Sequence, residues 1–353
     1  MTSSAEREPL SAVFARLIAN TGPISLMQYM GEANARYYTS RDPLGAAGDF
    51  ITAPEISQMF GELIGLWLTD LWMRAGRPAA VHYVELGPGR GTLARDALRV
   101  AARQGFEPQV HFVEGSAALK DIQIAAFPQA RWHHDLSSLP EDGPILLVGN
   151  EFFDALPIRQ LVMTDSGWRE RMIALEGDRF IPIAGSKPMD AAVPQGRREA
   201  PAGTILETCT GAAAVMEEVA RRLAVQGGAG LFIDYGHAQP RTGSTLQALR
   251  AHRMVDPFEN PGEADLTAHV DFAALAEVAA GQECRWLGTV TQGQWLTSLG
   301  IDARAAALTR GAPDQAEVIE AARHRLVADA QMGTLFKVMG LAGAGWPDGA
   351  GFS

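Results

Sequence analysis

The stretch Val81-His82-Tyr83-Val84-Glu85-Leu86-Gly87-Pro88-Gly89-Arg90-Gly91-Thr92 decides the fold of this chain. A short apolar segment runs directly into three glycines at alternate positions, and residues 93–100 continue with apolar side chains at helical spacing. Glycine allows a tight turn and lets the backbone approach a ligand without a Cβ in the way. The pattern predicts a strand, a glycine-rich turn and a helix, an arrangement typical of nucleotide binding.

The spacing of the glycines separates two classes of ligand. Dinucleotide-binding folds use Gly-x-Gly-x-x-Gly/Ala. Here the third glycine comes one position early, and Thr92 stands at the dinucleotide position. Glu85 followed by Gly87, Gly89 and Gly91 instead resembles the S-adenosylmethionine (SAM) loop of class I methyltransferases. An NAD site and a turn without any ligand are the alternatives.

Composition bounds the remaining possibilities. The chain has 353 residues, enough for two domains or one domain with a large insertion, and 47% of them are hydrophobic. A net charge of −11 argues against broad nucleic-acid or anionic-membrane binding. The first nine residues lack an apolar signal core, and no apolar run is long enough to span a membrane, so we expect a cytoplasmic, bacterial-type protein. Cys209 and Cys284 have no metal-site spacing, and we expect no metal.

The order of the expected elements predicts an α/β fold with a mostly parallel, Rossmann-like sheet. The expected strands are 81–86, 109–114, 145–149, 229–234, 284–290 and 334–340. They belong to a core of residues 79–157 and 208–341. An N-terminal helical extension, 1–78, is expected to cover the glycine loop as a lid, with helices at 10–38, broken at Thr21-Gly22-Pro23, and at 55–74.

Two segments depart from the α/β pattern. Residues 158–207 contain strand-like pieces separated by Asp165-Ser166-Gly167 and Glu176-Gly177-Asp178, which indicates a β-rich insertion that we expect to be a substrate subdomain. Within it, residues 186–203 are polar and rich in Pro and Gly, so we expect them to be mobile. We also expect residues 342–353 to form a flexible tail.

Candidate cofactor residues follow the predicted strands. Glu114 ends the second strand, 23 positions beyond Gly91, where a carboxylate can bind both ribose hydroxyls of an adenosine; a solvated acid is the alternative. Asp135 is placed either to accept from the adenine amino group, with Leu136 packing on the ring, or to cap a turn. The adjacent His133 and His134 have no third ligand at useful spacing.

The stretch Asn150-Glu151-Phe152-Phe153-Asp154-Ala155-Leu156-Pro157 follows the strand after which a class I methyltransferase places its acceptor. A neutral amine has little use for two carboxylates, whereas a guanidinium is bound by them as a fork. Glu151 and Asp154 could offset its charge beside a positive sulfonium and orient one nitrogen for in-line attack, with Asn150 beside them. The alternative is that Asp154 caps a helix and Glu151 faces solvent.

At this point the chain resembles the MidA family of class I methyltransferases, which includes the mitochondrial complex I assembly-factor arginine methyltransferase. The matching stretches are residues 48–62, from Gly48-Asp49-Phe50 to Phe60-Gly61-Glu62, and residues 84–93, together with Asn150 to Pro157, Phe232-Ile233-Asp234-Tyr235-Gly236, and residues 265–272, Asp265-Leu266-Thr267-Ala268-His269-Val270-Asp271-Phe272. The resemblance implies SAM as cofactor and, by analogy with the mitochondrial member, symmetric dimethylation of an arginine on a complex I subunit.

The family stretches suggest further roles. Asp49 and Phe50 are expected over the cofactor as part of a lid, Asp234 and Tyr235 beside the acceptor, and His269 as a possible aid to proton removal. Thr52-x-x-Glu55 has the spacing of a capping box. Asp271 is expected to cap a helix. This sequence has Ala53 where the family often has Ser and His269 where it often has Asp, which affects the identity of the acceptor more than that of the cofactor.

The leading hypothesis is a SAM-dependent protein arginine N-methyltransferase acting on a protein partner. Two alternatives are a small-molecule methyltransferase on the same fold and a SAM-binding assembly factor without catalytic activity.

Overall fold

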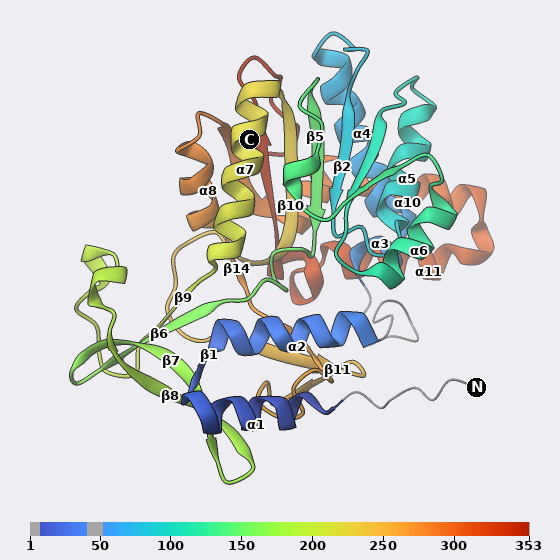
Figure 1. The fold of residues 1–353 in the computed structure, drawn as a ribbon. Coiled ribbons are helices and arrows are strands. Elements are labelled where there is room, and N and C mark those ends of the chain that lie inside the picture. The colour runs from blue at the N-terminus through green and yellow to red at the C-terminus, as the bar shows by residue number, and fades with distance from the viewer. Residues whose placement is uncertain (1–7, 41–51, 353) are drawn as a thin grey trace. The chain divides into compact units, whose positions relative to one another are not determined.

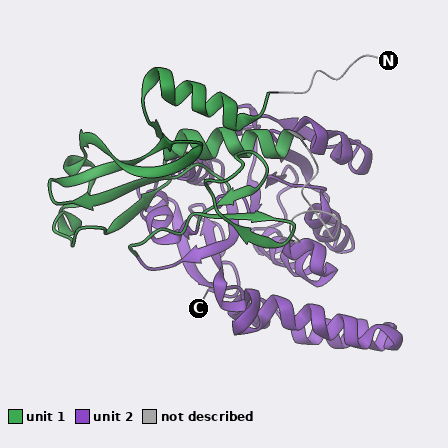
Figure 2. Ribbon diagram, turned by 90° about the horizontal axis from the view of Figure 1, so that it is seen from below, with its two compact units in different colours: residues 1–41, 155–211, 241–268 green, residues 42–154, 212–240, 269–353 purple. Residues whose placement is uncertain are grey.

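The computed structural model describes residues 8–40 and 52–352 of the chain. The chain folds into two compact units, each assembled from three separate segments (Figure 2). Unit 1 comprises residues 1–41, 155–211 and 241–268, and unit 2 comprises residues 42–154, 212–240 and 269–353. In the described ranges, no helix is long and apolar enough to cross a membrane.

Unit 2 is built on an eight-stranded sheet with the order β15-β16-β10-β5-β2-β3-β4, and β14 also pairs with β10 (Figure 1). The run from β10 to β4 is parallel, whereas β16 is antiparallel to both β10 and β15. The bounds are β2 His82–Leu86, β3 Gln109–Val113, β4 Arg131–His133, β5 Ile145–Asn150, β10 Gly228–His237, β14 Val270–Asp271, β15 Arg285–Thr291 and β16 Phe336–Ala342. The mostly parallel sheet and its six predicted strands are confirmed.

The register of the parallel strands brings their carboxyl ends to one edge of the sheet. Leu86 at the end of β2 pairs with Val113 of β3 and with Gly149 of β5. Gly149 in turn pairs with Phe232 of β10. The residues that follow these positions therefore emerge together, which is where open α/β sheets bind ligands.

Helices cover this sheet, and three of them are joined by ion pairs to one buried carboxylate. They are α3 Ala53–Ile56, α4 Gln58–Arg74, α5 Thr92–Ala102, α6 Ala117–Ala126, α7 Thr210–Gln226, α8 Phe272–Ala280, α9 Gln292–Ser298, α10 Ile301–Gly311 and α11 Ala316–Val327, with short turns η1 Leu136–Ser138, η4 Pro313–Gln315 and η5 Asp329–Gly333. Glu62 of α4 is buried and accepts hydrogen bonds from Arg304 of α10 at 2.6 Å and from Arg99 of α5 at 3.0 Å. These partners make burial of the carboxylate tolerable.

Among its described residues, unit 1 contains two antiparallel sheets and two α-helices. One sheet has the order β1-β7-β6-β9 with β8 beside β7, and the other has the order β12-β11-β13. Its elements are α1 Leu10–Thr21, β1 Ile24–Ser25, α2 Leu26–Ser40, β6 Arg159–Thr164, β7 Gly167–Glu176, β8 Arg179–Pro188, η2 Asp190–Ala192, η3 Gln195–Arg197, β9 Ile205–Thr208, β11 Gln247–Arg250, β12 Arg253–Val255 and β13 Asp265–Thr267. The expected β-rich insertion is thus present.

The N-terminal helices and the insertion share one core, so the division of the chain differs from the expected boundaries. The short strand β1 pairs with residues 172–173 of β7. Phe14 of α1, Tyr29 of α2 and Phe180 of β8 lie with their ring centroids 5.0 to 6.1 Å apart. Aromatic burial of this kind stabilises the joined segments, and the sequence pattern of each segment alone does not reveal it.

Two segments that we expect to be mobile make contacts with buried tryptophan side chains. Trp168 donates from Nε1 to the carbonyl of Arg198 at 2.9 Å, and Val193 is buried in the same apolar cluster. In the tail, the carbonyl of Ala350 accepts from Trp67 at 3.1 Å, and the Phe352 ring lies 6.4 Å from that of Trp67. The expectations that residues 186–203 and 342–353 are mobile stay predictions, and these contacts are the ones that such motion would have to break.

Candidate functional site

The three glycines after β2 adopt backbone conformations that other residues rarely take. Their φ angles are +59° at Gly87, +55° at Gly89 and +76° at Gly91. The left-handed region costs a residue with a Cβ about 1–2 kcal/mol. A Cβ on Gly87 would also lie 3.1 Å from the ring of Phe152, and one on Gly91 would lie 2.7 Å from the ring of Phe127. The backbone of the loop therefore requires glycine at alternate positions.

Glu85 lies on β2, two residues before the glycine loop, and is buried. The hydroxyl of Tyr83, which is also fully buried, donates to Oε2 of Glu85 at 2.5 Å. Burial raises the pKa of Glu85 to about 8, although the hydrogen bond from Tyr83 opposes this shift. The predicted cofactor residue Glu85 is thus oriented by a neighbour on the same face of the strand.

Glu114 follows β3 directly, as predicted, and both of its oxygens accept hydrogen bonds. Oε1 accepts from the backbone N–H of Ser116 at 2.7 Å, and Oε2 accepts from Nε2 of Gln123 at 3.1 Å. Burial is the main cause that raises the pKa of Glu114. Gln123 itself is fully buried and was not singled out by the sequence, because an amide in a helix gives no signal of its tertiary partners.

Asp135 caps the turn η1, so the second of the two readings left open by the sequence is observed. Its Oδ1 accepts from the backbone N–H of Ser137 at 2.9 Å and from the Ser137 hydroxyl. Asp135 is exposed while Leu136 is buried. A contact of this pair with an adenine ring stays a prediction.

The residues at the end of β5 show local backbone strain and a buried hydrogen-bond acceptor to which no described residue donates. Glu151 has φ +50°, a left-handed conformation that is uncommon outside glycine and that clusters at functional sites. Its Oε1 accepts from the backbone N–H of Ala53 at 3.1 Å and from Nδ2 of Asn150 at 3.2 Å. Oδ1 of Asn150 is buried, and no described residue donates a hydrogen bond to it. Such an atom is costly to leave unpaired, which suggests that a ligand provides its donor.

Asp234, at the same edge of the sheet, is buried and supports the loop that follows β5. Its Oδ2 accepts from the backbone N–H groups of Phe152 at 3.1 Å, Phe153 at 3.0 Å and Asp154 at 3.3 Å. Oδ1 accepts from the backbone N–H of Tyr235 at 3.0 Å. Its oxygens thus support the backbone around Asp154, and the predicted contact of Asp234 with the substrate stays a prediction.

Like charges surround this carboxylate. Burial, followed by the charges of Asp154 and Glu151, raises the pKa of Asp234 well above its ordinary value, against the effect of the backbone hydrogen bonds. Asp154 is also buried. The structure therefore brings three of the predicted acidic residues together in a place where a cation would reduce their repulsion.

Tyr235 and His269 lie side by side, and their contact with a substrate stays a prediction. Their rings meet edge to face at 5.6 Å, and Phe336 packs on Tyr235 at 5.5 Å. The two other residues of that hypothesis, Asp49 and Phe50, lie outside the described residues.

The two predicted helix caps had different outcomes. Asp271 caps α8, because its Oδ1 accepts from the backbone N–H of Ala274 at 3.1 Å. The expected capping box of Thr52 and Glu55 was wrong, since the Thr52 side chain makes no capping hydrogen bond at the start of α3. Glu55 instead lies 3.8 Å from the guanidinium of Arg90 in the glycine loop.

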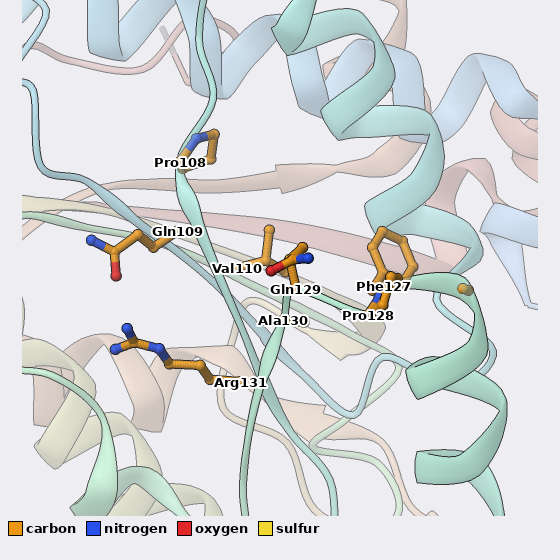
Figure 3. Close-up of a pocket in the computed structure, with 9 residues that line it drawn as sticks. Pro108, Gln109, Val110, Phe127, Pro128, Gln129, Ala130 and Arg131 are labelled. Atoms are coloured by element: carbon orange, nitrogen blue, oxygen red, sulfur yellow. The ribbon is translucent and has the colours of Figure 1, made fainter.

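A groove of about 570 Å³ lies beside the beginnings of β3 and β4 (Figure 3). It is lined by residues 108–110 and 126–131, which precede or begin β3 and β4. The predicted cofactor residues follow the strands and do not line it, so we do not assign this groove to the cofactor. Elsewhere in the described ranges, no group of three or more His, Cys, Asp or Glu side chains is arranged to hold a metal ion.

Comparison with known proteins gives consistent matches. A family model described as "Putative S-adenosyl-L-methionine-dependent methyltransferase" matches residues 63–290. "Protein arginine methyltransferase NDUFAF7, mitochondrial" from Xenopus tropicalis is 37% identical, and the match covers 91% of this chain and 82% of that protein. The human protein of the same name is 36% identical over 81% of this chain and 72% of its own length.

Solved structures agree with these matches. A crystal structure of a Burkholderia thailandensis protein bound to S-adenosyl-homocysteine is 28% identical, with a TM-score of 0.83 and coverage of 97% of this chain and 94% of that one. A native structure from the same organism is 29% identical, with a TM-score of 0.79 and coverage of 94% and 91%. The predicted class I methyltransferase fold, with N-terminal helices and an antiparallel β insertion, is confirmed.

Proposed function

The chain belongs to the MidA-like family of SAM-dependent methyltransferases, and from this premise we propose that it is a protein arginine N-methyltransferase. The fold and the cofactor follow from the family. The observation that carries the arginine proposal is the group formed by Asn150, Glu151 and Asp154, supported by Asp234, at the carboxyl ends of β5 and β10. The names of the curated relatives support the same acceptor class.

The residues after β2, β3 and β4 suit the parts of SAM. The glycine loop allows close approach of the backbone, and Glu114 offers two oriented oxygens to ribose hydroxyls. Asp135 and Leu136 follow β4, and we assign them to the adenine end; Glu85 lies on β2, two residues before the loop. When bound, SAM supplies a methyl group on a positively charged sulfonium.

A guanidinium matches the acceptor residues chemically. It carries five N–H donors in a planar fork and has no acceptor atom. The orphaned Oδ1 of Asn150 can accept one of these N–H groups. The carboxylates of Glu151 and Asp154 can accept others, and the bound cation would reduce the repulsion that raises the pKa of Asp234.

SAM would supply the methyl group to one guanidinium nitrogen and leave as S-adenosyl-homocysteine, and the proton that this nitrogen loses would pass to one of the carboxylates that accept its N–H groups, Glu151 or Asp154. The negative side chains offset the meeting of two positive groups, which is costly in a site of low dielectric constant. Asp234 holds the backbone of residues 152–154 and thereby fixes Asp154 relative to Asn150 and Glu151. Fixed geometry of this kind is what makes in-line attack efficient.

We extend the proposal to the protein partner. The family that the chain resembles includes a mitochondrial complex I assembly factor, so an arginine of a respiratory complex I subunit is the proposed target. Such an arginine would have to be modified before or during assembly, while it is still accessible. Dimethylation is proposed on the same ground.

Replacement of Glu151 by Gln tests the proposal. The amide oxygen can still accept from Ala53, so the local structure should persist while the charge is lost. We expect SAM affinity in calorimetry to stay within about threefold of wild type, and transfer to arginine peptides to fall about 100-fold or more. The exposed Glu107→Gln is the matched control, and Gly89→Val, at φ +55°, should abolish SAM binding.

The outcomes separate the candidate functions. Full transfer by Glu151→Gln would contradict the arginine proposal. Turnover of small amines without turnover of peptides would favour a small-molecule methyltransferase. SAM binding with no transfer to any protein in a lysate, together with rescue of complex I assembly by Glu151→Gln, would favour a non-catalytic assembly factor.

A further inference from the structure

Gln123 connects three parts of the cofactor site through one buried amide. It lies on α6, and its side chain is fully buried. Nε2 donates to the backbone carbonyl of Gly89 in the glycine loop at 2.8 Å and to Oε2 of Glu114 at 3.1 Å. Oε1 accepts from the indole N–H of Trp132 on β4 at 3.0 Å. One side chain thus links the loops that follow β2 and β3 to the strand β4.

The orientation of this amide is determined by its partners. The carbonyl of Gly89 and the carboxylate of Glu114 can only accept, so both need the NH₂ group. The indole of Trp132 can only donate, so it needs the carbonyl oxygen. A flipped amide would place acceptor against acceptor and donor against donor. Gln123 therefore has no alternative orientation that satisfies its neighbours.

We propose that Gln123 is a positioning residue for the cofactor, which fixes Glu114 and the Gly89 peptide so that the ribose and the glycine loop are presented together. The inference rests on the proposed role of Glu114 as the ribose carboxylate. A carboxylate has about four lone-pair sites. Ser116 uses one on Oε1, Gln123 uses one on Oε2, and the backbone N–H of Gly115 also interacts with the carboxylate, so the protein orients Glu114 and still leaves it able to accept from a ribose hydroxyl.

A second contact of α6 reinforces this assignment. The backbone N–H of Phe127 donates to the carbonyl of Gln123 at 2.8 Å, and the Phe127 ring lies against Gly91 so closely that a Cβ there would be 2.7 Å away. The end of α6 therefore contacts the glycine loop at Gly89 through Gln123 and at Gly91 through Phe127. Removing the amide frees the Gly89 carbonyl and Glu114 at once while Phe127 still holds the helix in place.

The first test measures ligand binding in the intact chain by calorimetry, with S-adenosyl-homocysteine and its 2′,3′-dideoxy analogue as probes. Gln123→Met keeps a similar volume but removes the amide. We expect its affinity for S-adenosyl-homocysteine to fall about tenfold or more, the size of one lost buried hydrogen bond. The preference over the dideoxy analogue should shrink toward one, because the analogue does not use Glu114. Gln129→Met, at an exposed position three residues after α6, is the matched control and should bind as wild type.

Gln123→Glu tests the hydrogen bonds of Gln123 separately from its packing, because the pH dependence of ligand affinity would not change if Gln123 only filled space. Its ionised carboxylate would face two acceptors, whereas its protonated form can donate to one of them. The gap in S-adenosyl-homocysteine affinity between this variant and wild type should therefore narrow as the pH falls from 8 to 6. Being isosteric, the variant also tests the proposal if Gln123→Met does not fold.

The assignment would be overturned if Gln123→Met bound S-adenosyl-homocysteine as tightly as wild type, or if it lost equal affinity for both probes. It would also be overturned if the difference in affinity between Gln123→Glu and wild type did not depend on pH. These assays contain no methyl acceptor. Failure of arginine transfer would therefore leave the result for Gln123 unaffected, and the reverse also holds.

Discussion

Gly91 and Gly105 have the same φ of +76° but different surroundings, which allows conformation and crowding to be measured apart. A Cβ at 105 meets nothing within 4 Å, whereas a Cβ at 91 meets Phe127 at 2.7 Å. We expect Gly105→Ala to lower the free energy of unfolding by about 1–2 kcal/mol through backbone strain alone. Gly91→Ala should lower the free energy of unfolding by a further ~1–3 kcal/mol through overpacking against Phe127, and it should also weaken SAM binding. Urea unfolding of the two variants measures the difference; equal losses would contradict the contact with Phe127.

At the scale of single residues, the sequence predicts positions whose chemistry is visible locally. The spacing of Gly87, Gly89 and Gly91 reports a backbone requirement that the φ angles bear out. The roles of Gln123 and Asp234 were not visible in this way. Gln123 binds a residue 34 positions away, and Asp234 binds backbone groups about 80 positions away. Such partners depend on the register of the sheet rather than on any local pattern.

At the scale of elements, three neighbouring strands carry a chain of histidines. Nδ1 of His82 on β2 lies 3.1 Å from Nε2 of His111 on β3, and Nδ1 of His111 lies 3.0 Å from Nε2 of His133 on β4. The ends contact the carbonyl of Asp142 and the hydroxyl of Ser138. Since a carbonyl only accepts, neutral rings that all carry the proton on Nε2 satisfy the whole chain. A second proton on His111 would set two N–H groups against each other.

This arrangement predicts a loss of stability in acid. Burial, with the positive charges that neighbouring histidines can carry, lowers the pKa of His111 from its ordinary 6.5 to about 4. Between these two pH values His111 is protonated in the unfolded chain but not in the folded chain. The free energy of unfolding should therefore fall by roughly 2–3 kcal/mol as the pH drops from about 6.5 to 4. Urea unfolding measured across this pH range should show that the free energy of unfolding depends less steeply on pH in His111→Gln than in wild type. The control His324→Gln, at an exposed position, should keep the wild-type pH dependence. An unchanged pH dependence in His111→Gln would show that His111 does not cause it.

Elements were predicted well where the pattern is long and poorly where it is short. The apolar runs of β2, β5 and β10 are buried along nearly their whole length, which explains why they stand out in the sequence. Strands of two to four residues, such as β1, β13 and β14, carry too few side chains to show an alternation. Their pairing is decided by the tertiary fold.

At the scale of the whole molecule, the net negative charge is carried by one unit. In unit 2, 27 Asp and Glu residues stand against 16 Lys and Arg, whereas unit 1 has 14 of each. Unit 2 therefore accounts for the entire net charge of −11. Because unit 2 also contains the proposed acceptor residues, its field should attract basic segments and repel acidic ones.

The charge asymmetry leads to a prediction about the acceptor. An arginine peptide flanked by lysines should have a lower KM than one flanked by serines, because the field of unit 2 raises its local concentration. Salt screens such attraction, with a Debye length of about 10 Å at 0.1 M. Raising NaCl from 0.05 to 0.5 M should increase the KM of the lysine-flanked peptide about 5–10-fold and that of the serine-flanked peptide much less. Calorimetric SAM affinity serves as the control for effects of salt on the cofactor site. Equal salt dependence for both peptides would show that contacts at the guanidinium, and not the charge of unit 2, select the substrate.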